Sequence, residues 1–110
     1  MEVKVDKING VDVVAVSGRL DASSTPVFDE KMKEVLSKNP AKVAVSLKEL
    51  EYVSSAGLRS FLAAAKEIKK SEGKLAFIEP TEAVLKVLKM SGMTTVLKIY
   101  NSLDEALKEL

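Results

Sequence analysis

Residues 42–62, "KVAVSLKELEYVSSAGLRSFL", contain the pattern that decides the fold. The first six residues, 42–47, are a short apolar run rich in β-branched side chains, which predicts a buried strand. The segment 48–57 is expected to turn the chain into a helix. That helix has one apolar face at helical spacing, made by Leu58, Phe61, Leu62, Ala65 and Ile68. A buried strand leading into an amphipathic helix is the repeating unit of a parallel α/β sheet.

Before this unit, the chain opens with two segments rich in β-branched residues, 3–8 and 11–18. The dipeptide Asn9-Gly10 separates them. Asn-Gly is the strongest short signal for a hairpin, because both residues tolerate the positive φ of a type I′ turn. The sequence therefore predicts an N-terminal antiparallel hairpin.

A first helix is expected between this hairpin and the buried strand. Thr25 followed by Pro26 is a suitable N-cap and first-turn pair. Apolar residues then recur at helical spacing up to Leu36. Asn39-Pro40 ends the helix, because proline cannot continue it.

The remaining chain alternates between strands and helices. We expect a strand at 74–80, a helix at 81–92, a strand at 95–100 and a terminal helix from Ser102. Gly73 is the expected C-cap of the helix before it. Ser102 and Glu105 have the spacing of a capping box.

The order β-β-α-β-α-β-α-β-α predicts the fold class. It indicates a single α/β domain over residues 1–110, with about five strands and about four helices. The sheet is expected to be mixed but mostly parallel, with the N-terminal hairpin adding an antiparallel edge.

The composition excludes several classes of function. Lysine plus arginine number 17 and aspartate plus glutamate 16, so no broad basic surface is available for nucleic acid or for a membrane. The chain has no cysteine and no histidine. It therefore has no disulfide, no thiol nucleophile, and neither the commonest general base nor the commonest transition-metal ligand. No cofactor or metal is expected.

The location is predicted from the N-terminus and from the hydropathy. The start "MEVKVDKING" alternates like a strand and lacks the apolar core of a signal peptide. No apolar run approaches the length of a membrane span. We therefore expect a cytoplasmic protein without direct membrane insertion.

An enzyme is not expected from these residues. Neither of the common glycine-rich phosphate-binding loops is present. Without histidine, a catalytic serine would need a lysine as its base. At the S-x-x-K spacing from Ser55 the residue is Leu58.

The serine pair Ser54-Ser55 lies between the predicted strand and helix, where two interpretations stay open. Serine is a preferred N-cap, so the pair could serve the fold alone. The carboxyl ends of strands and the helix N-termini beside them are also where ligands and partners gather in α/β sheets. A phosphate on a serine would be favoured by the free N–H groups there, and Gly57 would let a partner approach the backbone.

The whole chain resembles a STAS domain, and in particular a free-standing anti-sigma factor antagonist. The segment 43–62 is similar to the central strand, loop and second-helix start of that family, and it is the most specific part. The stretch "SGRLDASSTP" (17–26) resembles the family's approach to its first helix. "KLAFIEP" (74–80) and "VLKMSGM" (87–93) resemble its later strand and helix.

The resemblance implies a phosphorylation switch. In that family, a partner anti-sigma factor that is a kinase phosphorylates the loop serine, and a phosphatase reverses the modification. By position Ser55 matches the phosphoacceptor, with Ser54 as an alternative acceptor. Asp21 matches the acidic residue before the first helix. Ser46 and Ser54 stand where the family often has aspartate, which is expected to make the loop less negative.

The resemblance also implies a binding surface for the partner. The unphosphorylated protein is expected to bind the anti-sigma factor and so release a sigma factor. The residues assigned to this surface are Asp21, Ser24, Ser54, Ser55, Ala56, Gly57, Leu58 and Arg59.

Two other functions remain possible at this point. The chain could be an interaction subunit of a transport or signalling assembly that never carries phosphate, since STAS-like domains also serve in such assemblies. It could also sense a nucleotide or another small ligand in the strand-end crevice, although no residue specifies one.

Overall fold

The computed structural model describes all 110 residues. The elements are β1 (Glu2–Ile8), β2 (Val11–Leu20), α1 (Thr25–Leu36), β3 (Lys42–Val53), α2 (Ser55–Lys70), β4 (Lys74–Ile78), α3 (Glu82–Met90), the 3₁₀ turn η1 (Met93–Thr95), β5 (Ile99–Tyr100) and α4 (Leu103–Glu109). No helix combines the length and the apolar composition needed to cross a bilayer.

The five strands form one mixed sheet in the order β1-β2-β3-β4-β5. Strands β1 and β2 are antiparallel, and the other neighbours are parallel. Both features confirm the fold class predicted from the sequence. The turn between β1 and β2 also has the expected geometry, since Asn9 has φ 50° and Gly10 has φ 79°.

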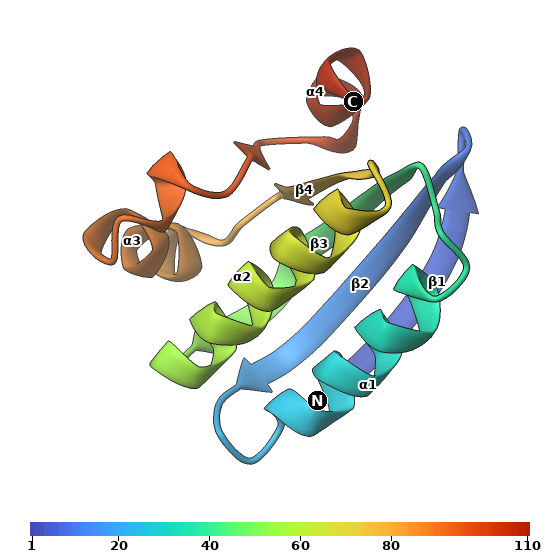
Figure 1. Ribbon diagram of the computed structural model, residues 1–110. Helices are drawn as coiled ribbons and strands as arrows, with labels where there is room; N and C mark the ends of the chain where they lie inside the picture. The colour runs from blue at the N-terminus through green and yellow to red at the C-terminus, as the bar shows by residue number, and fades with distance from the viewer.

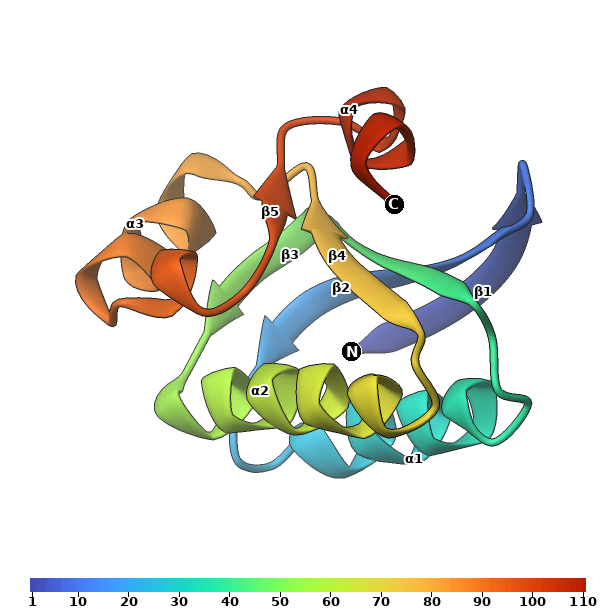
Figure 2. The same ribbon diagram turned by 45° about the horizontal axis from the view of Figure 1, so that its top comes forward.

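Helices cover the two faces of the sheet unequally (Figures 1 and 2). Helices α1 and α2 lie side by side on one face, and α4 lies on the other. Helix α3 packs on β3, beyond the short stretch where β4 pairs with that strand. The main core therefore lies under α1 and α2.

Three aromatic rings join the layers of this core. Phe28 of α1 and Phe61 of α2 meet edge to face with ring centroids 5.5 Å apart. Phe61 also contacts Phe77 of β4 at 4.7 Å. All three side chains are almost completely buried, so Phe61 links both long helices to the sheet.

Strand β3 is longer than predicted. It continues from Lys42 to Val53, whereas only 42–47 was expected as strand. Beyond Ser46 it pairs with β2 and no longer with β4. Lys48 and Glu49 are exposed there, so the apolar run ends although the strand does not.

The predicted strand at 95–100 is mostly wrong. Only Ile99 and Tyr100 pair with β4, and the segment before them begins with η1. Gly92 has φ 77° and turns the chain out of α3. The apolar Leu97 is buried in the core by this turn and not by a strand.

Two predicted caps of the long helices are also wrong. The N-cap of α1 lies one residue before Thr25, and the C-cap of α2 is Ser71, two residues before Gly73. Ser24 is the N-cap of α1, and Thr25 is already helical. At the end of α2, Glu72 takes the left-handed conformation, with φ 60°. Gly73 follows it and donates its N–H to the Ile68 carbonyl at 3.0 Å, which completes a Schellman motif. A Cβ on Gly73 would lie 2.7 Å from Ile68 Cγ1, so packing requires glycine there.

The N-cap of α4 is confirmed at Ser102, whose hydroxyl accepts the Glu105 N–H at 3.1 Å. The Glu105 carboxylate reaches back to the N–H of Asn101 at 3.0 Å, one residue earlier than a standard capping box requires. The capping box is therefore present, but the Glu105 side chain bonds to the residue before the N-cap and not to the N-cap itself.

Replacing Phe61 with alanine should lower the free energy of unfolding by about 3–5 kcal/mol. The smaller side chain would leave a cavity and lose the contacts with both neighbouring rings. Urea denaturation measures this loss. The control Val27→Ala on α1, where the side chain is 49% exposed, should change stability by less than about 1 kcal/mol. Equal effects of the two substitutions would contradict the assignment of the core.

Candidate functional site

The candidate site lies where β2 and β3 end and the loops to α1 and α2 begin (Figure 1). Leu20 and Val53 are register partners at these strand ends. The Ser54 N–H donates to the Leu20 carbonyl at 2.9 Å. This bond joins the two loops, as expected for the carboxyl edge of a parallel sheet.

Ser54 is the N-cap of α2. It has extended backbone angles, φ −93° and ψ 177°, and its hydroxyl accepts the Gly57 N–H at 3.3 Å. Its carbonyl accepts the Leu58 N–H at 2.9 Å. Ser54 therefore does what an N-cap serine does and is engaged by the fold.

Ser55 is the first residue of α2, and its side chain is exposed. Its hydroxyl makes no hydrogen bond within the chain, in contrast to that of Ser54. The sequence left two interpretations open, a serine that caps the helix and a serine that is accessible to a partner. Each of them fits a different residue. Ser54 caps the helix, and Ser55 presents a free hydroxyl at its N-terminus.

Gly57 and Leu58 face the interior of the protein. Gly57 is buried, and a Cβ there would lie 2.7 Å from Val53 Cγ2 and 2.9 Å from Leu20 Cγ. Leu58 is 8% exposed and belongs to the main core. Glycine at 57 thus lets α2 approach the strand ends closely, which fixes where Ser55 lies.

Asp21 organises the loop before α1. Its Oδ1 accepts the Ser23 hydroxyl at 2.7 Å and the backbone N–H groups of Ser23 and Ser24 at 3.0 and 3.3 Å. The Ser23 hydroxyl is the largest cause that lowers the pKa of Asp21 below its ordinary value of 3.8, and the N–H donors add to it against some desolvation. Asp21 is therefore a stable anion beside the Ser54 loop.

Ser24 closes the same loop. Its hydroxyl donates to the Arg19 carbonyl at 2.7 Å and accepts the Asp21 N–H at 3.0 Å. Ser24 is half-buried, and its side chain is occupied by these contacts. The structure thus places Ser24 as a loop-stabilising residue next to the candidate site.

Ser46 does not belong to the site. It lies in the middle of β3, is 8% exposed, and donates its hydroxyl to Glu79 Oε1 at 3.3 Å. Ser54 lies eight positions further along the chain, which is roughly 25 Å of extended strand. The expectation that Ser46 makes the serine loop less negative is therefore wrong, because β3 is longer than predicted.

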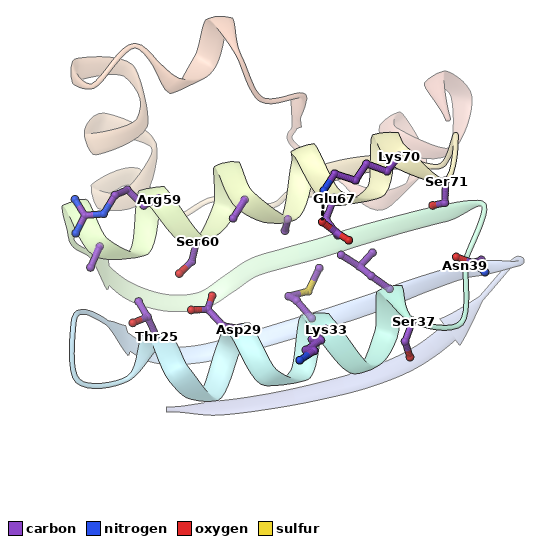
Figure 3. Close-up of a pocket in the computed structure, with 15 residues that line it drawn as sticks. Thr25, Asp29, Lys33, Ser37, Asn39, Arg59, Ser60, Glu67, Lys70 and Ser71 are labelled. Carbon is purple, nitrogen blue, oxygen red and sulfur yellow. Dashed lines mark ion pairs between the residues drawn. The ribbon is translucent and has the colours of Figure 1, made fainter.

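A groove of about 1000 Å³ runs between α1 and α2 from the site toward the other end of the helices (Figure 3). Ala56 and Arg59 line it beside Ser55. Figure 3 shows Asp29 of α1 and Ser60 of α2 pointing toward each other across the groove, whereas Arg59 extends outward at one end. Arg59 is exposed and forms no ion pair. The site is thus continuous with a long concave surface.

One residue pair next to the site was not predicted from the sequence. The Arg19 guanidinium lies 4.3 Å from the ring centroid of Tyr52, a cation–π contact between register partners of β2 and β3. The signal would have been the strand register, which could not be read while β3 was expected to end at Leu47. No group of acidic, histidine or cysteine residues is arranged to hold a metal ion.

Replacing Gly57 with alanine should destabilise the protein by about 1–2 kcal/mol, because overpacking against Leu20 and Val53 exceeds the helix-propensity gain of alanine. Chemical denaturation is the measurement, with the exposed Ala63→Ser on the same helix as control. A Gly57→Ala variant more stable than the wild type would show that the space is open.

Asp21 should contribute stability only while it is ionised. Because its folded-state pKa is lowered, this contribution is present above the ordinary value of 3.8 and is lost as the pH falls through the lowered value. Asp21→Asn should therefore melt below the wild type at pH 7, and the difference should shrink on acidification to pH values of about 2. A difference that is independent of pH would refute this role.

The comparisons with known proteins agree with this architecture. The STAS domain family profile matches residues 2–106. The anti-sigma-B factor antagonist of Bacillus subtilis is 31% identical over 101 residues, which cover 90% of this chain and 92% of that protein.

Solved structures show the same arrangement. The crystal structure of an anti-sigma factor antagonist from Mycobacterium paratuberculosis has a TM-score of 0.89 at 25% identity and covers 98% of this chain and 92% of that one. The Bacillus cell fate determinant SpoIIAA in its phosphorylated form has a TM-score of 0.72 at 16% identity and covers 98% of both chains, which shows the shared fold alone. The chain therefore belongs to the STAS domain family, among its anti-sigma factor antagonists.

Proposed function

We propose that the chain binds an anti-sigma factor that has serine kinase activity, and that this binding releases a sigma factor. Phosphorylation of Ser55 by the same partner switches the binding off, and a phosphatase restores it. The observation that carries the proposal is the free, exposed hydroxyl of Ser55 beside a neighbour, Ser54, that already caps the helix. This role belongs in the cytoplasm of a bacterium.

The position of Ser55 suits a reversible charge switch. A phosphate there would add about −1.5 to −2 charges at neutral pH, next to the free N–H groups and positive dipole end of α2. Arg59 lies four residues on, on the same side of the helix, and has no ion-pair partner in the chain. These groups would hold the phosphate without refolding the domain.

The same phosphate would prevent binding at an interface built for a neutral hydroxyl. Burial of a doubly charged group between two proteins carries a large desolvation cost, and Asp21 in the adjoining loop adds negative charge nearby. The switch is thus a local electrostatic change whose readout is the loss of a complex.

The proposed binding residues differ in exposure and fall into two groups. Ser55, Ala56 and Arg59 are accessible at the start of α2 and would contact the partner, together with the Asp21 loop. The other four residues would contribute indirectly, because their contacts stabilise the conformation of this surface. They are Ser24, Ser54, Gly57 and Leu58. The chain thus supplies a binding surface and an acceptor hydroxyl, and the chemistry of phosphoryl transfer belongs to the partner.

The proposal is tested by incubation with a kinase-type anti-sigma factor encoded near this gene and ATP, followed by site-mapped mass spectrometry. One phosphate on Ser55 is expected in the wild type and none in Ser55→Ala. The matched variant Ser54→Ala should lose about 1 kcal/mol of stability with its N-cap and should still accept phosphate on Ser55. Ser55→Ala should keep wild-type stability.

Binding measurements complete the test. Unphosphorylated wild type and Ser55→Ala should both bind the partner, whereas the phosphorylated wild type should bind at least tenfold more weakly. Phosphate on Ser54 would contradict the division between the two serines. Binding without any phosphorylation would favour the alternative of an interaction subunit that carries no phosphate.

A further inference from the structure

A second, smaller cavity lies at the opposite end of α2 from Ser55. It has a volume of about 210 Å³, is partly open to solvent, and lies between the second half of α2, β4 and the segment before β5. Its apolar lining consists of Leu62, Ala65, Ile68, Leu75, Phe77, Val96 and Leu97. Ile68 and Phe77 are almost fully buried, so side chains of the hydrophobic core form the inner wall of this cavity.

All charged residues that line this cavity are lysines. They are Lys66, Lys69, Lys74 and Lys98, and no acidic residue lines it. None of the four takes part in an ion pair, although other lysines of the chain do, such as Lys70 with Glu67 at 3.4 Å. Four exposed lysines without ion-pair partners thus line an apolar pocket in a chain whose net charge is only +1.

The fold explains only part of this arrangement. Lys69 lies in the last turn of α2, where cations are favoured by the helix dipole, and Lys66 lies about one turn earlier. Lys74 begins β4 and Lys98 precedes β5, so they reach the same cavity from two further elements. Like charges gathered from three elements repel one another, and an anion bound among them would relieve that repulsion.

We propose that this cavity binds a single-chain carboxylate, a free medium-chain fatty acid whose tail enters the apolar pocket and whose headgroup meets the lysines. At about 210 Å³ the cavity is smaller than the sites that take drug-sized ligands, so it suits a single narrow tail of about seven or eight carbons. Small-ligand sites typically pair such an apolar lining with a few polar groups that fix one end of the ligand.

This site is independent of the proposed anti-sigma factor surface. Lys69 lies fourteen positions after Ser55 on α2, which is about 21 Å along the helix. Binding of the carboxylate can therefore be tested on the isolated chain, and failure of either proposal leaves the other untouched.

The experiment is a titration of the ¹⁵N-labelled protein with octanoate, followed by amide chemical shifts and calorimetry. Saturable changes are expected at the amides around Gly73, Leu75 and Leu97. The double variant Lys74→Gln/Lys98→Gln should bind about tenfold more weakly. The matched variant Lys86→Gln/Lys89→Gln removes two exposed lysines of α3 that lie outside the cavity and should bind like the wild type.

A second pair of variants tests the apolar part of the site. Ala65→Leu fills the cavity and should abolish saturable binding, whereas Ala63→Leu, on an exposed position of the same helix, should not. Far-UV circular dichroism verifies that both variants are folded. The proposal is overturned if octanoate causes no saturable shifts, if the shifts centre elsewhere, or if both lysine pairs weaken binding equally. Binding to phosphatidylglycerol vesicles that octanoate does not compete for would also overturn it, since the lysines would then recognise a membrane surface.

Discussion

The backbone hydrogen bond from the Ser54 N–H to the Leu20 carbonyl, 2.9 Å long, is the contact on which the candidate site depends. It ties the ends of two parallel strands together at the point where both chains leave the sheet for their helices. Gly57 makes the contact sterically possible, because its missing side chain leaves room for Leu20 and Val53. With the strand ends fixed in this way, the first turn of α2 has one orientation, and Ser55 faces solvent.

The division between the two serines follows from this constraint. A helix start needs one side-chain acceptor for its free N–H groups, and Ser54 supplies it to Gly57. The next residue, Ser55, then lies within the first turn of the helix, and its hydroxyl makes no hydrogen bond within the chain. A modification at that position can change charge without removing the cap, which is the property that a reversible binding switch requires. The adjoining groove between α1 and α2 extends the surface available to a partner.

The sequence predicted the fold class because strands and helices alternate clearly and because Asn9-Gly10 specifies its turn. It failed where tertiary contacts override local pattern. Lys48 and Glu49 ended the apolar run of β3, although backbone pairing with β2 continues to Val53. Leu97 lies in a segment whose apolar pattern predicted a strand, but its side chain packs into the core from a turn. For the site, the family resemblance placed Ser55 ahead of Ser54 as the acceptor, but the residue pattern did not predict which serine caps the helix. Either hydroxyl suits an N-cap, and only backbone geometry decides which one accepts the Gly57 N–H.

The most direct measurement of the central claim is the hydrogen-exchange rate of the Gly57 amide in the wild type, Ser54→Ala and Ser55→Ala. Amides in the first turn of a helix exchange fast unless a cap protects them. If Ser54 is the cap, the Gly57 amide should exchange faster in Ser54→Ala and at the wild-type rate in Ser55→Ala. Faster exchange in Ser55→Ala alone would show that Ser55 caps the helix, and its hydroxyl would then not be free for a partner.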